Sequence, residues 1–192
     1  RVSHPDTIVH VSDPTWANHE PLLGSSGLAL QRYPYYEAAS RGVAFERMLD
    51  HFGRLPSGSI VLLHACCHNP TGADLDAGQW SALADVVEAR GLVPFVDLAY
   101  QGFGDDLESD VHGLRLIAAR VPQLLIAISC SKNFGLYRER TGALAVVAAM
   151  EGRRGAPVAA AHLDARSTAA RPALDDDETA VPLRVARGRD AV

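Results

Sequence analysis

Four short apolar runs stand out along the first two thirds of the chain. Each is rich in β-branched or aliphatic residues and is too short for a typical helix, so each predicts a buried strand. The runs occupy residues 7–12, 60–66, 93–97 and 124–130. The spacing of apolar residues between these runs indicates how the strands connect.

Helical periodicity fills both gaps between the last three runs. A sequence typical of a capping box, Asp76 to Gln79, precedes the first periodic stretch, and Gly91 follows it. This stretch predicts a helix over residues 77–90, and a second helix is predicted over about 110–120. The core-facing positions at helical spacing are Trp80, Leu83, Ala84 and Val87 in the first helix and Leu114, Ile117 and Ala118 in the second.

The order strand, helix, strand, helix, strand predicts the α/β fold class, with a mainly parallel sheet flanked by helices. In such sheets ligands bind beyond the carboxyl ends of the strands. The polar residues at the ends of the apolar runs are therefore candidate site residues: Asn69, Asp97, Tyr100, Ser129, Ser131 and Lys132.

Charge and hydrophobicity narrow the possible partners. A formal net charge of -5 offers no basic footprint for nucleic acid and no polybasic patch for a lipid surface. No apolar run approaches the roughly 20 residues that span a bilayer, and the first residues carry no signal-peptide pattern. We therefore expect a cytoplasmic protein that acts on small molecules.

The three cysteines are odd in number and lie in apolar runs, which favours buried thiols over disulfides.

A single residue among the eighteen basic ones, Lys132, is lysine, and all the others are arginine. A guanidinium group stays protonated and forms no Schiff base, whereas a lysine amine can serve as a nucleophile. The retained lysine therefore indicates covalent chemistry. Chance is the alternative, because a GC-rich genome favours arginine codons.

The chemistry of the neighbouring candidates points to pyridoxal phosphate. A carboxylate such as Asp97 can keep a heterocyclic nitrogen protonated, and Asn69 and Tyr100 can donate hydrogen bonds to an anionic oxygen. Lysine forms the Schiff base in proteins that use this cofactor, and an acid partners its pyridinium nitrogen. Two hydroxyls and a guanidinium group would suit its phosphate: Ser129, Ser131 and Arg140.

Each of these residues also has a purely structural interpretation. Asp97 could cap a helix, Tyr100 could belong to the core, and Arg140 could pair with Glu139 on a solvated face. A soft-metal site is a further alternative, because three potential ligands alternate along one extended segment: His64, Cys66 and His68. No fourth ligand cluster is apparent in the sequence. We assign no metal site.

Several segments together resemble the class I aminotransferases that act on aspartate and aromatic amino acids. They are HACCHNPTGADLDAGQW at 64–80, PFVDLAYQGF at 94–103, SCSKNFGLYRERTGAL at 129–144 and DPTWANH at 13–19. The resemblance covers about residues 6–149. It implies the large domain of the fold-type I transferases that depend on pyridoxal phosphate.

The resemblance implies a role for each candidate. Lys132 would form the Schiff base and then act as general base and acid, Asp97 would bind the pyridinium nitrogen, and Tyr100 would tune the site; these three would be catalytic. Trp16 would stack on the cofactor ring, with His19 behind Asp97. The full cofactor-binding set implied is Trp16, His19, Asn69, Asp97, Ala99, Tyr100, Ser129, Ser131, Lys132 and Arg140. The peptide bonds before Pro14 and Pro70 match positions that are often cis in this family.

The activity implied is ping-pong transfer of an amino group from an aromatic or dicarboxylic amino acid to a 2-oxo acid such as 2-oxoglutarate, by a homodimer in the complete protein. Residues 1–150 would be part of the cofactor-binding domain. Because the resemblance stops near Met150 and Arg1 is not an initiator methionine, we expect an incomplete chain whose residues 151–192 form an atypical, disordered tail in place of the small domain. The alternative is an inactive remnant, truncated or frame-shifted, that still binds the cofactor.

Overall fold

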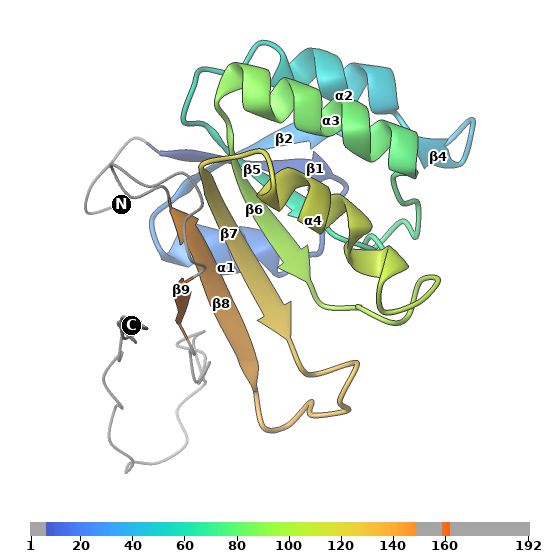
Figure 1. Cartoon of the computed structure of the whole chain (residues 1–192), viewed down its shortest axis with the longest axis vertical. Coiled ribbons are helices and arrows are strands. Elements are labelled where there is room, and N and C mark those ends of the chain that lie inside the picture. Colours follow the sequence, from blue (N-terminus) through green and yellow to red (C-terminus); the bar gives the residue numbers. More distant parts are fainter. Residues whose placement is uncertain (1–6, 149–158, 162–192) are drawn as a thin grey trace, which may run out of the picture.

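A seven-stranded sheet is the centre of the computed structural model, which describes residues 7–148 and 159–161 (Figure 1). Its strands are β1 (Ile8–Asp13), β2 (Ala29–Pro34), β5 (Ile60–His64), β6 (Val93–Leu98), β7 (Gln123–Ser129), β8 (Gly142–Ala148) and β9 (Ala159–Ala161). They are ordered β2-β1-β5-β6-β7-β8-β9. The pairs from β2 to β7 are parallel, and β8 and β9 are added antiparallel.

The four predicted strands are confirmed as β1, β5, β6 and β7, and so is the mainly parallel α/β fold. Strands β2 and β8 were not predicted. The edge strand β2 buries only Tyr33 fully, and its other positions are half-buried or exposed. Such a strand lacks the continuous apolar run that reveals its buried neighbours.

The helix predicted over residues 77–90 is confirmed as α3 (Ala77–Arg90). The Asp76 side chain accepts a hydrogen bond from the Gln79 backbone, the Gln79 side chain accepts one from the Asp76 backbone, and Gly91 ends the helix at φ 60°. The second predicted helix is split into the 3-10 turn η1 (Ser109–Val111) and α4 (His112–Ala118). The remaining elements are α1 (His19–Ser25), α2 (Phe45–Phe52) and the hairpin of β3 (Tyr36–Glu37) and β4 (Gly42–Val43).

Helices cover both faces of the sheet. In Figure 1, α2, α3 and α4 lie in front of it and α1 lies behind. The larger core fills the front face, where Met48, Phe52 and Leu83 are completely buried. A smaller cluster behind the sheet joins Val9, Val11 and Leu62 to partly buried residues that include Leu23 of α1. Burial on both faces explains why the central strands are continuous apolar runs.

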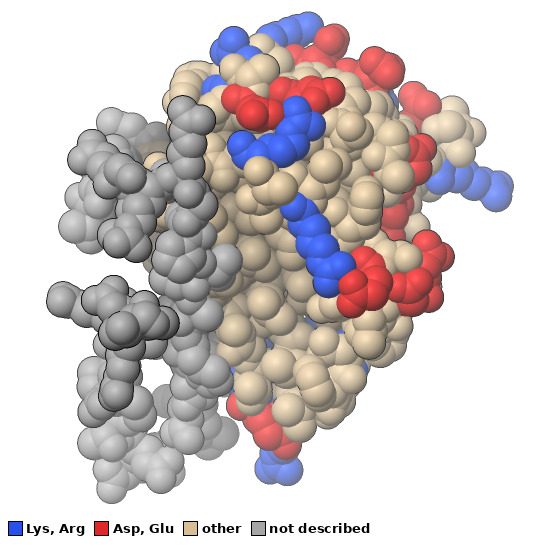
Figure 2. All heavy atoms as spheres, viewed as in Figure 1, with Lys and Arg blue, Asp and Glu red and all other residues tan. Residues whose placement is uncertain are grey.

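Charged side chains of both signs are interspersed over the helical face, as Figure 2 shows. Arg120, just after α4, forms ion pairs with Asp85 and Glu88 of α3 at 2.5 and 2.7 Å. None of the helices in the described part of the chain has the length and apolarity that crossing a bilayer requires. The division into residues 1–150 and a tail at 151–192 stays a prediction, because apart from β9 the tail lies outside the described residues.

The contact between α3 and α4 predicts a stability effect at Gly113. A β-carbon there would lie 2.1 Å from the Trp80 ring, so Gly113→Ala should lower the free energy of unfolding by about 1–3 kcal/mol through overpacking. Urea unfolding followed by circular dichroism measures the change. Gly24→Ala is the matched control, because no atom lies within 4 Å of its added carbon; it should leave the stability unchanged or raise it by up to about 1 kcal/mol. Equal effects of both substitutions would contradict this packing.

Candidate functional site

A cavity of about 250 Å³ opens at the carboxyl ends of β5, β6 and β7. The parallel register places His64, the last residue of β5, opposite Asp97 of β6, and Ser129 ends the next strand. All of the predicted cofactor-binding residues except His19 line this cavity: Trp16, Asn69, Asp97, Ala99, Tyr100, Ser129, Ser131, Lys132 and Arg140. Three strand ends, the segment after β1 and the loop after β7 therefore meet at one point.

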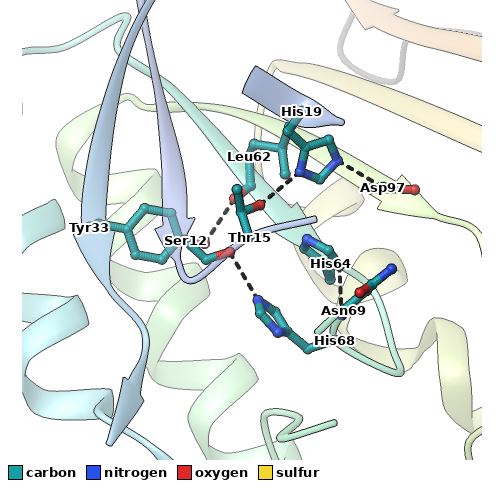
Figure 3. Close-up of polar contacts among 9 residues, drawn as sticks. All are labelled: Ser12, Thr15, His19, Tyr33, Leu62, His64, His68, Asn69 and Asp97. Carbon is teal, nitrogen blue, oxygen red and sulfur yellow. Dashed lines mark hydrogen bonds and ion pairs between the residues drawn. The ribbon is translucent and has the colours of Figure 1, made fainter. Parts of the chain in front are cut away.

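His19, the remaining predicted residue, holds Asp97 from behind. Its Nε2 lies 3.1 Å from Asp97 Oδ2, and its Nδ1 lies 2.8 Å from the Thr15 hydroxyl oxygen, so the imidazole bridges the two side chains (Figure 3). Since an ionised carboxylate only accepts, Nε2 donates to Asp97 and Nδ1 accepts from Thr15 when the ring is neutral. The side chain of Asp97 is 19% exposed and that of His19 is 7% exposed. Asp97 is not the N-cap of any helix in the described residues; its carboxylate is held by His19 at the cavity wall.

The amine of Lys132 lies between two aromatic rings. Its Nζ is 6.0 Å from the centre of the Trp16 ring and 5.1 Å from the centre of the Tyr100 ring. Among the described residues, no carboxylate forms an ion pair with this amine. Tyr100 also packs against the main core. It is therefore both a core residue, as the structural alternative holds, and a cavity residue. The amine of the single lysine therefore faces the cavity without a carboxylate partner among the described residues.

Hydroxyls and a guanidinium group lie at the loop that follows β7. The Ser131 backbone donates to the Ser129 hydroxyl oxygen at 3.2 Å, and Ser131 is only 3% exposed. Arg140 adopts a left-handed φ of 53° and donates to the Tyr137 carbonyl at 3.2 Å. Its pairing with Glu139, the structural alternative, is not among the salt bridges of the described residues. These groups make this end of the cavity a suitable place for an anion.

A buried imidazole, His68, anchors the turn that carries Asn69. Its Nε2 lies 2.9 Å from the Ser12 hydroxyl, its Nδ1 lies 2.8 Å from the Thr71 hydroxyl, and its ring stacks on Tyr35 at 3.9 Å. Burial lowers the pKa of His68 to about 3, and repulsion from a neighbouring imidazole adds to the effect. A neutral ring thus fixes the turn that holds Asn69.

The peptide bonds before Pro14 and Pro70 are both cis, as the resemblance implied. Each lies next to a segment that contributes to the cavity: Trp16 and Asn18 follow the first, and Asn69 precedes the second.

Two cavity residues, Asn18 and His64, were missed as candidate site residues. His64 ends β5, but the strand predicted from the sequence extends to residue 66, so the sequence marks His64 only as a potential metal ligand and not as a strand end. Asn18 lies within the segment 13–19 but carries no separate signal in the sequence. Burial lowers the pKa of His64 to about 4, and its Nε2 has no hydrogen-bond partner among the described residues.

The potential metal ligands that lie close together in the described residues differ from the three that the sequence suggests. Atoms of His19, His64 and Asp97 lie within 4.8 Å of one another, whereas Cys66 and His68 do not belong to that group. His19 and Asp97 are already joined by the 3.1 Å hydrogen bond. The soft-metal alternative of His64, Cys66 and His68 is therefore not assembled in this structure.

Known proteins match the chain over most of its length. Residues 1–174 match the family described as aminotransferase class I and II. An aromatic-amino-acid aminotransferase of Paracoccus denitrificans is 54% identical over 149 residues, which are 78% of this chain and 38% of that protein. An aspartate aminotransferase of Pseudomonas aeruginosa is 49% identical over 143 residues, 74% of this chain and 36% of the relative.

Solved structures match the fold as well. An aromatic-amino-acid aminotransferase from Burkholderia pseudomallei, covalently bound to pyridoxal phosphate, superposes with a TM-score of 0.75 at 47% identity. The match covers 77% of this chain and 37% of that one. The chain therefore spans a little more than a third of the length of the relatives it matches.

The buried histidines predict how stability depends on pH. The ordinary histidine pKa is 6.5, whereas the folded values are about 4 for His64 and about 3 for His68. The unfolding free energy should therefore be highest above pH 6.5 and fall as the pH decreases toward 4, by up to about 1.4 kcal/mol per pH unit for each imidazole. Below about pH 4, His64 is protonated in the folded and in the unfolded chain, so it no longer contributes to the pH dependence of the unfolding free energy.

Urea unfolding at a series of pH values measures this slope. His68→Gln should reduce the slope between pH 6 and 4, because one imidazole that excludes protons in the folded state is gone. Gly24→Ala leaves both imidazoles in place and should keep the slope of the unsubstituted chain. The same slope in the His68 variant would show that this ring is not held neutral by folding.

Proposed function

Because the chain belongs to the class I and II aminotransferases, we propose that its cavity holds pyridoxal phosphate on Lys132 for transfer of an amino group from an aromatic or dicarboxylic amino acid to a 2-oxo acid. One observation carries the proposal. The only lysine of the chain faces the same small cavity as the Asp97 carboxylate, which His19 fixes in place.

The donor set of the cavity suits this cofactor at each of its polar groups. Asp97 would partner the ring nitrogen, and Asn69 and Tyr100 would donate to the ring oxygen. Trp16 and Ala99 supply apolar walls for a flat heterocycle. The phosphate would be held by the hydroxyl and guanidinium groups of Ser129, Ser131 and Arg140.

Bound pyridoxal phosphate supplies an electron sink that acidifies the α-hydrogen of an amino acid. Lys132 Nζ, once free, takes the proton from the substrate α-carbon, holds it, and gives it up again on the same side of the cavity. Asp97 provides the negative charge that keeps the ring nitrogen protonated, and the hydrogen bond from His19 prevents this carboxylate from rotating away. The rings of Trp16 and Tyr100, 6.0 and 5.1 Å from the amine, would stabilise its positive charge while it carries the proton.

The relatives support the substrate class, and exposed apolar side chains support the dimer. The relatives include proteins named for aromatic amino acids and for aspartate, so both kinds of amino acid are candidates. Four exposed apolar side chains lie in the loops after β6 and β7: Phe103, Leu107, Phe134 and Tyr137. Exposed apolar side chains of this kind suit a contact with a second subunit, so we propose a homodimer in the complete protein. The free thiols fit a cytoplasmic location.

A second candidate function is cofactor binding without turnover. It is favoured by the cavity lining, because every cavity residue assigned above would contact the cofactor and none is assigned to the carboxylate of the substrate. The two candidates differ in whether bound cofactor is followed by release of a 2-oxo acid.

Amino transfer should depend on Lys132. The chain, mixed with pyridoxal phosphate and tyrosine or aspartate, should release about one 2-oxo acid per bound cofactor in a single half-reaction, measured by chromatography. Lys132→Arg keeps the positive charge but removes the transferable proton, so its rate should fall by about 10²–10⁴-fold. Cofactor binding without release of 2-oxo acid would favour the second candidate. Undiminished release by the variant would contradict the role of Lys132.

Cofactor affinity should depend on Asp97. Asp97→Asn removes a charge-assisted hydrogen bond of about 1.5–3 kcal/mol, so binding of pyridoxal phosphate should weaken at least tenfold, as measured by absorbance titration. Asp50→Asn is the matched control, because Asp50 lies on α2 with a side chain 74% exposed. Equal affinities for the two variants would contradict the assignment of Asp97 to the ring nitrogen.

A further inference from the structure

The guanidinium group of Arg32 bridges two carboxylates that belong to different elements. Its Nη1 donates to Asp13 Oδ1, at the end of β1, over 2.7 Å. Its Nε and Nη2 donate to Glu20 Oε1, in the first turn of α1, over 3.1 and 2.5 Å. Arg32 itself belongs to the edge strand β2. One side chain therefore ties β1, β2 and α1 together.

Strand register explains why Arg32 reaches both carboxylates. The parallel pairing of β1 with β2 sets Arg32 opposite Val11. Side chains two residues apart on a strand share a face, so Asp13 lies on the same face as Val11. Val11 is completely buried in the cluster behind the sheet, against which Leu23 of α1 packs. Arg32 therefore lies on the face that α1 covers, where Glu20 is within its reach.

The two carboxylates flank the segment that supplies part of the candidate site. Only residues 14–19 separate Asp13 from Glu20. Arg32 is not among the residues that line the cavity around Lys132, but it is bonded to both ends of this segment. Four residues of the segment line the cavity or hold Asp97 at its wall: Thr15, Trp16, Asn18 and His19.

Inside this segment, Trp16 lies close to the surface. Its side chain is half-buried, and its ring packs edge-on against the His19 ring with the two centres 5.3 Å apart. The next two residues, Ala17 and Asn18, are exposed. A segment with few buried contacts opens locally at a low cost in free energy. Constraints at its ends therefore contribute to keeping the Trp16 ring in place.

We propose that Arg32 is a positioning residue, which keeps the Trp16 ring in place as a wall of the cavity by holding Asp13 and Glu20 together. This role rests on the proposed function, because the position of Trp16 affects binding only if the cavity holds a flat ring. The side-chain type suits the role. A guanidinium group has five donors in a rigid planar fork and can bond two carboxylates at once, whereas an ammonium group is a compact point charge.

The exposure of the bridge separates its local effect from its effect on overall stability. The side chains of Arg32, Asp13 and Glu20 are 52%, 56% and 46% exposed. Exposed ion pairs contribute little to the free energy of unfolding and are screened by salt. Loss of the bridge should therefore leave the urea midpoint nearly unchanged and loosen only the segment that it holds.

Fluorine NMR of the full chain labelled with 5-fluorotryptophan tests the bridge without any cofactor. The chain has two tryptophans, so two resonances are expected, and Trp16→Phe assigns them. Arg32→Ala should shift or broaden the Trp16 resonance. It should leave the resonance of Trp80 in place, because that ring is 5% exposed in the main core. Arg32→Lys should have a smaller effect, since the charge is kept and the fork is lost.

Arg120→Ala is the matched control. The Arg120 guanidinium also bridges two carboxylates, those of Asp85 and Glu88, but both lie on α3. Its removal should leave the Trp16 resonance where it is in the unsubstituted chain.

Glu20→Gln tests the same bridge from its other end. It should reproduce the change seen with Arg32→Ala, because it removes the charge that the guanidinium group bonds on α1. The two substitutions together should change the Trp16 resonance no more than Arg32→Ala alone, as expected for partners in one interaction.

Absorbance titration with pyridoxal phosphate measures the consequence for binding. Arg32→Ala should weaken the affinity by about threefold to tenfold relative to the unsubstituted chain, and Arg120→Ala should not change it. At an ionic strength of about 1 M the screening length falls to about 3 Å, so the affinity ratio between Arg32→Ala and the unsubstituted chain should approach one.

Circular dichroism shows whether each variant is folded, and Glu20→Gln decides the question if Arg32→Ala is not. The proposal is overturned if the Trp16 resonance stays unchanged in the folded variants, if Arg120→Ala changes it equally, or if Arg32→Ala and Arg120→Ala bind the cofactor equally well. Absence of binding by the unsubstituted chain would instead refute the proposed function, and the fluorine resonances alone would then decide whether Arg32 holds the segment.

Discussion

Parallel pairing of β5 with β6 and of β6 with β7 is the constraint on which the site depends. The pairing aligns the carboxyl ends of three strands at one edge of the sheet, so His64, Asp97 and Ser129 meet although they are far apart in sequence. Apolar cores on both faces hold the strands in this register. A slip of one residue would turn Asp97 to the opposite face, because side chains alternate along a strand. The chemistry of the cavity is therefore a consequence of strand register.

Buried imidazoles then fix the polar groups that the register brings together. His19 links Asp97 to Thr15, and His68 links the turn before Pro70 to Ser12. At His68 the imidazole is neutral, so it donates at one nitrogen and accepts at the other without placing a charge in the core. Folding keeps His64 and His68 neutral by removing them from water, which couples the order of the site to the stability of the fold.

Much of this architecture could be predicted from the sequence, and the reason lies in burial. Strands covered on both faces are short apolar runs, and α3 is marked at both ends by the capping box at Asp76 and by Gly91. The edge strand β2 and the antiparallel β8 could not be predicted in this way, because their positions are only partly buried. Most cavity residues were recognised because they follow an apolar run. His64 was not, because it still lies within one.

The central claim is that the single lysine carries the cofactor, and borohydride reduction tests it most directly. The chain is incubated with pyridoxal phosphate, reduced, digested and mapped by mass spectrometry. Because Lys132 is the only lysine, the α-amino group is the only competing primary amine of the chain. The account predicts a stable phosphopyridoxyl group on Lys132 in stoichiometric amount. Labelling of the α-amino group alone, or no labelling at all, would contradict it.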